Sequence, residues 1–246
     1  MIISTVVQAH KNPSFVNENI RMVKKNVGKN VICVIDSANW GEFKDEQMEC
    51  ETLCGYYHND RRNPYKNFAN GLSQLYRRFP DSEWFCNSEF DVFFKNDSFK
   101  EDLNRFRKEH NAGLVGFNMR IKPFDCPFIN AMLKIKFDVG YYMIGCCMFF
   151  HRSYMERLIE VNFFERFLNY TSSFTSSNIP CEEYDISEHL YPSLAANIGI
   201  PIASFENAES SVFGKRKYFV RFKPEVTKDV VYNDAYSIIH PYKNAM

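Results

Sequence analysis

The sequence has 246 residues, a length that suits one α/β domain or two small ones. Hydrophobic residues make up 45% of it and include 24 Phe and 14 Tyr, which is enough apolar side chain for a sizeable core. Lys plus Arg and Asp plus Glu each number 30, so the formal net charge is zero. General binders of nucleic acid or of anionic membrane surfaces need a basic excess, and the charge balance therefore argues against both classes.

No segment is expected to cross or enter a membrane. The apolar run YYMIGCCMFF at 141–150 is far shorter than the roughly 20 residues that a bilayer requires. The N-terminal MIISTVVQAH lacks the basic start, long apolar run and cleavage site of a signal peptide. We therefore expect a soluble, cytoplasmic protein. Its eight cysteines are expected to be reduced thiols, since Cys50 and Cys54 could share a helix face but no second pair completes a zinc site.

The first half of the chain alternates strand-like and helix-like patterns. Residues 2–7 form a β-branched run typical of a strand. Ser14 is placed to cap a helix, and Gly28 is a typical helix end. The apolar residues between them share one helical face: Val16, Ile20, Val23 and Val27. The segment VICVID at 31–36 is typical of a buried parallel strand that ends on a carboxylate.

A polar segment, GYYHNDRRNPYK at 55–66, precedes the next helix. That helix is indicated by apolar residues at helical spacing: Phe68, Leu72, Leu75, Tyr76 and Phe79. A strand is predicted over EWFC (83–86), a helix over 98–109 and a strand over 113–117. Strands that alternate with helices predict a doubly wound, Rossmann-like sheet whose ligand lies beyond the carboxyl ends of the strands.

The second half is less regular. MIGCCMFF at 143–150 predicts a long apolar strand, and a capping box from Ser153 to Glu156 predicts the start of the following helix. KYFVRF (217–222) and SIIHPYK (237–243) predict two further extended segments. A mixed sheet flanked by helices is the expected outcome.

The segment WFCNSEFDVFF at 84–94 is the most informative. A buried strand ends there, and Glu89 and Asp91 follow at i and i+2 before the chain becomes apolar again. Carboxylates in apolar surroundings are costly unless a partner such as a divalent cation compensates them. A polar turn in which Asp91 caps the next segment explains the same residues equally well.

This segment resembles the acid-x-acid signature of the GT-A glycosyltransferases, with Glu in the first place. The resemblance implies a single GT-A-like domain over 1–246, with a nucleotide-sugar-binding half (1–95) and an acceptor-binding half (96–246). It also implies that Asp91 coordinates Mn²⁺ or Mg²⁺ on the donor diphosphate, and that Glu89 holds the ribose or the metal's waters.

The resemblance extends to other donor-side residues. STVVQAH and VIDS resemble the two strand ends that contact the nucleotide, which implies a base or ribose role for Asp36, Gln8 and His10. Taken by itself, Asp36 is as well explained as a helix cap. RRNPYKNFANGL resembles the helix before the acid motif, and its candidates for donor binding are Arg62, Lys66 and Asn70. Solvated surface charge is the competing explanation for the basic residues.

The acceptor side is implied by two further segments. GYYMIGCCMFF resembles a turn and strand that border the sugar, with Gly145 as a point of close approach. CEEYDISEHLYPSLAANIGI at 181–200 resembles the segment that carries the general base of inverting members. The resemblance places the base at Glu188, with Asp185 second and the pair Glu182 and Glu183 in reserve. Acids that simply cap a helix are the alternative.

SIIHPYK resembles the late segment whose His completes the metal shell in many GT-A enzymes, which implies a metal ligand at His240 and a phosphate contact at Lys243. A structural His is the alternative. The chain is thus expected to be an inverting, metal-dependent transferase that takes a UDP- or GDP-sugar donor and a glycan or other hydroxyl acceptor. A sugar nucleotidyltransferase and an inactive sugar-binding module are the rival hypotheses.

Overall fold

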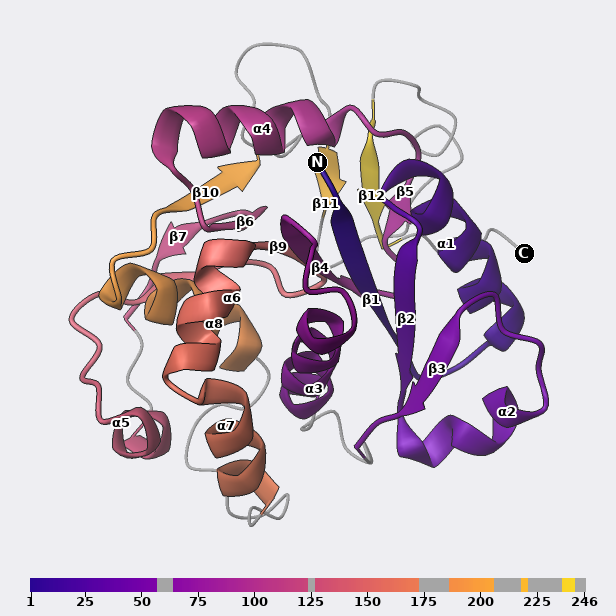
Figure 1. Cartoon of the computed structure of the whole chain (residues 1–246), viewed down its shortest axis with the longest axis horizontal. Helices are drawn as coiled ribbons and strands as arrows, with labels where there is room; N and C mark the ends of the chain where they lie inside the picture. Colours follow the sequence, from indigo (N-terminus) through magenta and orange to yellow (C-terminus); the bar gives the residue numbers. More distant parts are fainter. Residues whose placement is uncertain (57–63, 124–126, 173–185, 206–217, 221–235, 242–246) are drawn as a thin grey trace.

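The computed structural model describes residues 1–56, 64–123, 127–172, 186–205, 218–220 and 236–241. Its centre is a seven-stranded sheet in the order β10-β6-β9-β4-β1-β2-β3 (Figure 1). These strands are β1 (Ile3–Ala9), β2 (Asn30–Ile35), β3 (Glu51–Cys54), β4 (Trp84–Glu89), β6 (Leu114–Phe117), β9 (Cys147–His151) and β10 (Ile202–Phe205). Neighbouring strands are parallel except where β9 lies antiparallel to both β4 and β6. The predicted α/β fold with a mixed sheet is confirmed.

Two smaller sheets stand beside the central one. β5 (Phe93–Phe94), β11 (Tyr218–Val220) and β12 (Ile238–His240) form the order β11-β12-β5, and β7 (Arg120–Ile121) pairs with β8 (Tyr141–Tyr142). β12 is antiparallel to β5 and parallel to β11. The two predicted C-terminal segments are therefore strands, but they belong to a sheet of their own. β5 begins two residues after Asp91. Because β12 pairs with β5, it brings His240 close to Glu89 and Asp91.

The helices form a layer on each face of the central sheet (Figure 1). α1 (Pro13–Asn26) and α4 (Phe99–His110) contribute to one buried cluster, and α3 (Pro64–Arg78), α6 (Arg152–Glu160), α7 (Phe163–Ser172) and α8 (Ile186–Asn197) to the other. Successive strand residues face opposite layers, so Val7 packs in the first cluster and Val6 in the second. The short elements are η1 (Ser37–Asn39), α2 (Trp40–Lys44) and α5 (Pro127–Leu133). None of the described helices is both long enough and apolar enough to span a bilayer.

Both predicted N-caps are wrong, each for a local reason. α1 is capped by Asn12, whose Oδ1 accepts from the amide of Phe15 at 3.2 Å, because Pro13 takes the first helical position and leaves Ser14 inside the helix. α6 is capped by His151, whose Nδ1 accepts from the amide of Ser153 at 3.1 Å. The predicted capping box used the hydroxyl of Ser153 as the acceptor, whereas the structure uses the imidazole of His151.

Two further expectations need correction. The predicted strand at 143–150 begins only at Cys147, because the chain turns at 145–146 and the amide of Met143 donates to the carbonyl of Glu188 in α8. Cys54 lies in strand β3, which pairs with β2, and so Cys50 and Cys54 share no helix. The cysteines that the structure describes are free thiols, as predicted, while Cys126 and Cys181 lie outside the described residues.

The cap on α6 gives the fold a pH dependence of known sign. Burial, together with the nearby charges of Arg107 and Arg152, lowers the pKa of His151 from 6.5 to about 4. Protons therefore bind the unfolded chain more readily than the native one. As the pH falls from 6.5 towards 4, we expect the free energy of unfolding of the wild type to fall relative to that of His151→Asn, which keeps a capping acceptor but does not titrate. Urea unfolding at pH 7.5 and pH 5 measures this difference, and parallel pH profiles would contradict it.

Candidate functional site

Glu89, Asp91 and His240 lie together at one edge of the fold. Glu89 ends β4, Asp91 lies in the turn that leads into β5, and His240 ends β12, which pairs with β5. The Nε2 atom of His240 is 3.4 Å from Oδ1 of Asp91 and 3.6 Å from Oε2 of Glu89. One potential ligand atom from each residue lies within 4.8 Å of the other two. The three residues predicted as metal ligands therefore converge.

The cluster attracts positive charge. The side chains of His240 and Asp91 are 9% and 16% exposed, whereas that of Glu89 is 48% exposed and faces solvent. Burial disfavours a charged imidazole, but contacts with Cys146, Asp91 and Glu89 outweigh it and raise the pKa of His240 well above its usual value. A divalent cation held by two carboxylates and an imidazole would neutralise the two negative charges.

A pocket of about 190 Å³ adjoins this cluster at the carboxyl ends of β1, β2 and β4. Glu89 belongs both to the lining of this pocket and to the cluster with Asp91 and His240. The lining residues are Gln8, Ala9, His10, Val34, Asp36, Asn67, Glu89 and Phe90. Gln8, His10 and Asp36, which the sequence assigned to a nucleotide, are thus brought together with Glu89 around one pocket. This is the edge at which open parallel sheets bind their ligands.

The walls of the pocket are fixed by hydrogen bonds and ring contacts. Asp36 is buried and caps η1 by accepting from the amide of Ala38 at 2.9 Å, so its helix-cap explanation is confirmed, and its nucleotide role stays a prediction. Gln8 donates through Nε2 to Oδ1 of Asn87. The ring of His10 meets that of Phe90 edge-on, with centroids 4.8 Å apart. These contacts give the pocket a defined shape.

The turn at 143–146 joins the acid cluster to α8. The carbonyl of Cys146 accepts from the amide of Glu89 at 2.8 Å. One residue earlier, the amide of Gly145 donates to Oε1 of Glu188 at 2.7 Å. A Cβ atom on Gly145 would lie 2.9 Å from Cγ of Glu188, so glycine is needed here for space, while the predicted approach of Gly145 to a sugar stays a prediction. The turn therefore contacts both Glu89 and Glu188.

Pro192 adds a second bond between α8 and this turn. A proline inside a helix cannot donate to the carbonyl four residues before it, which here is the carbonyl of Glu188. That carbonyl accepts from the amide of Met143 at 3.0 Å instead. Pro192 lies within α8, between Ile186 and Asn197, so it does not disturb the helix start as the sequence suggested. Glu188 is anchored by both its backbone and its side chain.

The other predicted residues lie elsewhere. Lys66 is buried rather than solvated, and burial lowers its pKa; its Nζ lies 5.9 Å from the centre of the Tyr56 ring. Asn70 is half-buried on the same helix, and neither it nor Lys66 is among the pocket-lining residues. Their donor contacts remain predictions. Arg62, Asp185 and Lys243 lie outside the described residues, as do Glu182 and Glu183.

Three residues of the site were missed by sequence reasoning. Asn67 lines the pocket and holds its wall, since its Oδ1 accepts from the amide of Tyr56 at 2.7 Å. Phe90, between the two acids, also lines the pocket. Cys146, whose carbonyl accepts from the amide of Glu89 at 2.8 Å, was assigned only to an apolar strand. Asn67 lies beside Lys66 in a segment already singled out, so a weak signal for it existed.

Comparisons with known proteins give a likeness of fold only. No family model and no curated protein matches the sequence. Among solved structures, a glycosyltransferase involved in glycosylation of the major capsid of PBCV-1 is similar over 84% of this chain and 82% of its own, with 14% identity and a TM-score of 0.44. CMP:2-keto-3-deoxy-manno-octonic acid synthetase, solved with CTP, is similar over 84% and 90%, with 12% identity and a TM-score of 0.43.

The contact between Gly145 and Glu188 predicts the effect of adding one methyl group. Gly145→Ala should lower the free energy of unfolding by about 1–3 kcal/mol, because the new Cβ overpacks against Cγ of Glu188. In a Glu188→Ala background, which lacks Cγ, the same change should cost much less. Denaturant titration of the four proteins in this cycle measures the coupling.

Gly41→Ala is the matched control, because nothing lies within 4 Å of its added Cβ. We expect that variant to be neutral or slightly more stable. An equal cost of Gly145→Ala in both backgrounds would show that the clash with Glu188 does not account for the glycine.

Proposed function

We propose that this chain is a metal-dependent glycosyltransferase that moves a sugar from a UDP- or GDP-sugar to a hydroxyl of a glycan or other acceptor, with inversion. The observation that carries the proposal is the convergence of Glu89, Asp91 and His240 beside a pocket at the carboxyl ends of the parallel strands. A pocket for a nucleoside and an adjoining cation site together fit a nucleoside diphosphate. The pocket residues all come from 1–95, the proposed donor half of one cytoplasmic domain.

The donor would lie with its nucleoside in the pocket and its diphosphate towards His240. Asp36 and Gln8 supply polar atoms to the base and ribose, while Asp91 and His240 would hold the ion and Glu89 the ribose or the ion's waters. When bound, the ion would neutralise the diphosphate and make the nucleotide a better leaving group. A donor set of two carboxylates and one imidazole suits Mn²⁺ better than Mg²⁺, which prefers oxygen ligands.

Glu188 is proposed as the general base. Its Oε1 is held by the amide of Gly145, one residue from the carbonyl that holds Glu89. A carboxylate held by the turn that also contacts Glu89 would take the proton of an acceptor hydroxyl as that oxygen attacks the anomeric carbon. Direct attack inverts the anomeric centre. Asp185 is the second candidate for the base.

The metal assignment predicts which single changes abolish binding. Asp91→Asn and His240→Gln should each remove turnover and the rise in melting temperature that Mn²⁺ with UDP or GDP produces. Asp91→Asn keeps the shape of the side chain, so the native fold should remain. His240→Gln replaces a buried ring by an amide, so we expect it to lower the free energy of unfolding as well, without unfolding the chain. Differential scanning fluorimetry with and without Mn²⁺ measures the shift, and a glycosyltransfer or donor-hydrolysis assay measures turnover.

Asp97→Asn and His110→Gln are matched controls, since these side chains are 70% and 59% exposed and lie outside the site. They should behave as the wild type. Unchanged turnover in Asp91→Asn would remove the metal mechanism. Release of pyrophosphate from a nucleoside triphosphate and a sugar phosphate, without transfer from nucleotide-sugars, would identify a nucleotidyltransferase instead.

The base assignment predicts a loss of rate without a loss of donor affinity. Glu188→Gln keeps an oxygen for the amide of Gly145 but cannot take a proton, so turnover should fall about 10²–10⁴-fold. Donor affinity should stay within about twofold. Steady-state kinetics measure both, and proton NMR of the first-formed product should find the inverted anomer. A larger loss in Asp185→Asn would move the role there, and a retained anomer would exclude direct displacement.

A further inference from the structure

The two-stranded ribbon of β7 and β8 carries two cations on one of its faces. Arg120 lies opposite Tyr142 in the ladder, and Ile121 lies opposite Tyr141. Directly opposed residues of an antiparallel pair share a face, and successive residues alternate between the two faces. Arg120 and Tyr142 therefore point to the same side. Lys122 returns to that side, because its Nζ lies 5.6 Å from the centre of the Tyr142 ring.

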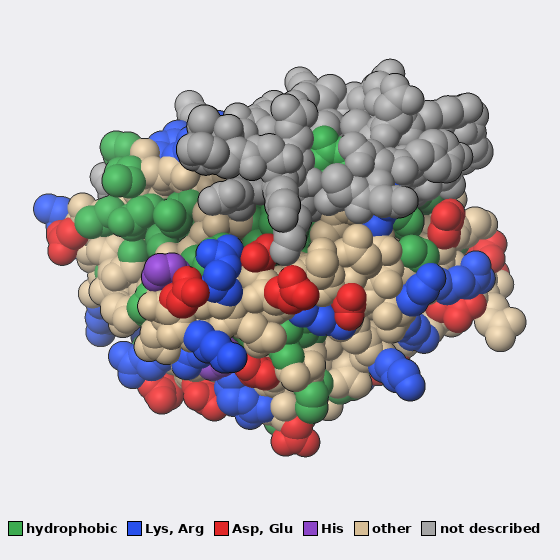
Figure 2. Space-filling model, turned by 90° about the horizontal axis from the view of Figure 1, so that it is seen from above, with side chains coloured by type: hydrophobic (Ala, Val, Ile, Leu, Met, Phe, Trp, Pro, Cys, Tyr) green, Lys and Arg blue, Asp and Glu red, His purple; other side chains and the backbone are tan. Residues whose placement is uncertain are grey.

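The charge on this face is positive and open to solvent. Arg120 and Lys122 are both exposed, and the described residues of the ribbon, 119–122 and 140–142, include no acid. Arg120 forms no ion pair with any residue that the structure describes. The face that carries α4 is different, since acidic and basic side chains are interspersed over it (Figure 2). Cations without nearby acids favour an anionic partner.

The ribbon leads to the proposed general base. The ring of Tyr142 lies 5.3 Å from that of His189, which is the neighbour of Glu188 in α8. The next residue, Met143, donates its amide to the carbonyl of Glu188 at 3.0 Å. Gly145, whose amide holds the side chain of Glu188, follows Tyr142 by three residues, which span at most about 11 Å of backbone. The cationic face is thus within reach of an acceptor at Glu188.

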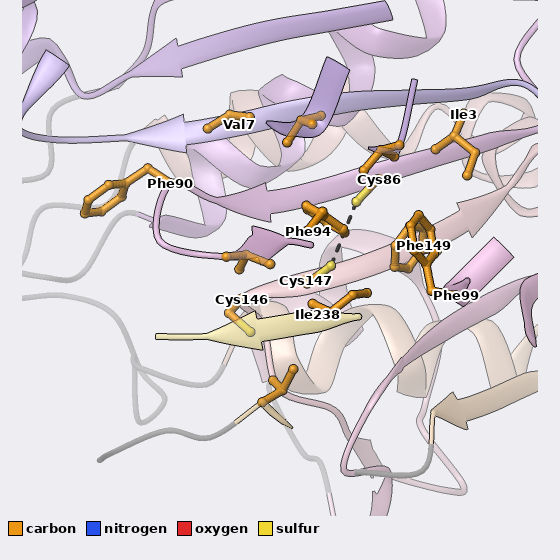
Figure 3. Packing of buried hydrophobic residues seen from close by; sticks show 14 of the residues in the cluster. Ile3, Val7, Cys86, Phe90, Phe94, Phe99, Cys146, Cys147, Phe149 and Ile238 are labelled. Carbon is orange, nitrogen blue, oxygen red and sulfur yellow. Dashed lines mark hydrogen bonds between the residues drawn. The ribbon is translucent and has the colours of Figure 1, made fainter. Parts of the chain in front are cut away.

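The position of the ribbon is fixed on both sides of Tyr142. Before it, the amide of Tyr141 donates to Oγ of Ser193 at 2.8 Å and ties β8 to α8. After the turn, the sulfur of Cys147 lies 3.9 Å from that of Cys86 in the core (Figure 3). A ligand that meets an already ordered backbone loses less free energy to ordering on binding.

We propose that this face binds an acidic group of the acceptor, so that the acceptor is an anionic glycan carrying a carboxylate or a phosphate. The planar guanidinium of Arg120 matches either group with two parallel hydrogen bonds, and Lys122 adds a second positive charge. The inference rests on the proposed function, because it places the acceptor beside Glu188. It makes Arg120 and Lys122 specificity residues that contact the acceptor away from the reacting atoms.

The test is direct binding to the full chain, followed by nuclear magnetic resonance titration with three probes. Trigalacturonic acid carries carboxylates, glucose 6-phosphate carries a phosphate, and maltotriose is neutral. The wild type should bind at least one charged probe more tightly than maltotriose, and added salt should weaken that binding. The double variant Arg120→Gln, Lys122→Gln should raise the Kd of that probe about 3- to 10-fold and leave maltotriose unaffected. The charged probe that responds identifies the acidic group.

The double variant Arg77→Gln, Lys108→Gln is the matched control, since it removes the same charges from exposed positions on α3 and α4. It should bind every probe as the wild type does. The inference is overturned if the wild type binds neither charged probe, binds charged and neutral probes equally, or loses affinity equally in the two double variants. The titrations do not depend on turnover. Absence of sugar transfer to every acceptor would therefore refute the proposed function separately.

Discussion

The hydrogen bond from the amide of Glu89 to the carbonyl of Cys146 is the contact on which the site depends. It exists because β9 runs antiparallel to β4, so that Cys147 at the start of β9 pairs with Ser88 near the end of β4. An antiparallel strand inserted among parallel ones places its entering turn at the same edge as their carboxyl ends. The turn at 143–146 can therefore reach the acid loop and α8 at once.

The small sheet β11-β12-β5 places His240 beside the two acids. Glu89 and Asp91 follow a buried strand, and two carboxylates so close together repel each other unless a positive group lies between them. β12 supplies that group by pairing with β5, which begins two residues after Asp91. Ile238 and Ile239 are fully buried, so apolar packing holds the histidine against the acids. The charge on the ring and the packing of its strand support the same arrangement.

Much of the site could be predicted because its residues carry local patterns. Asp36 and Glu89 end apolar strand-like runs, and the carboxyl ends of parallel strands share one edge of a sheet. Asn67 and Cys146 could not be predicted in the same way. Asn67 is one of several polar residues on an amphipathic helix, and Cys146 has the composition of a core strand. Their roles depend on hydrogen bonds with the amides of Tyr56 and Glu89, which no local pattern specifies.

By itself, the sequence determined the α/β class and the order of its first strands and helices, because apolar periodicity and strand-end acids are local properties. It failed at the caps of α1 and α6, where Pro13 and His151 altered a standard pattern within one turn. Only the tertiary structure decided that residues 143–146 turn, that Pro192 frees a carbonyl for Met143, and that the chain's end forms a separate sheet. Each of these rests on a hydrogen bond between segments far apart in the chain, and no local pattern specifies such a partner.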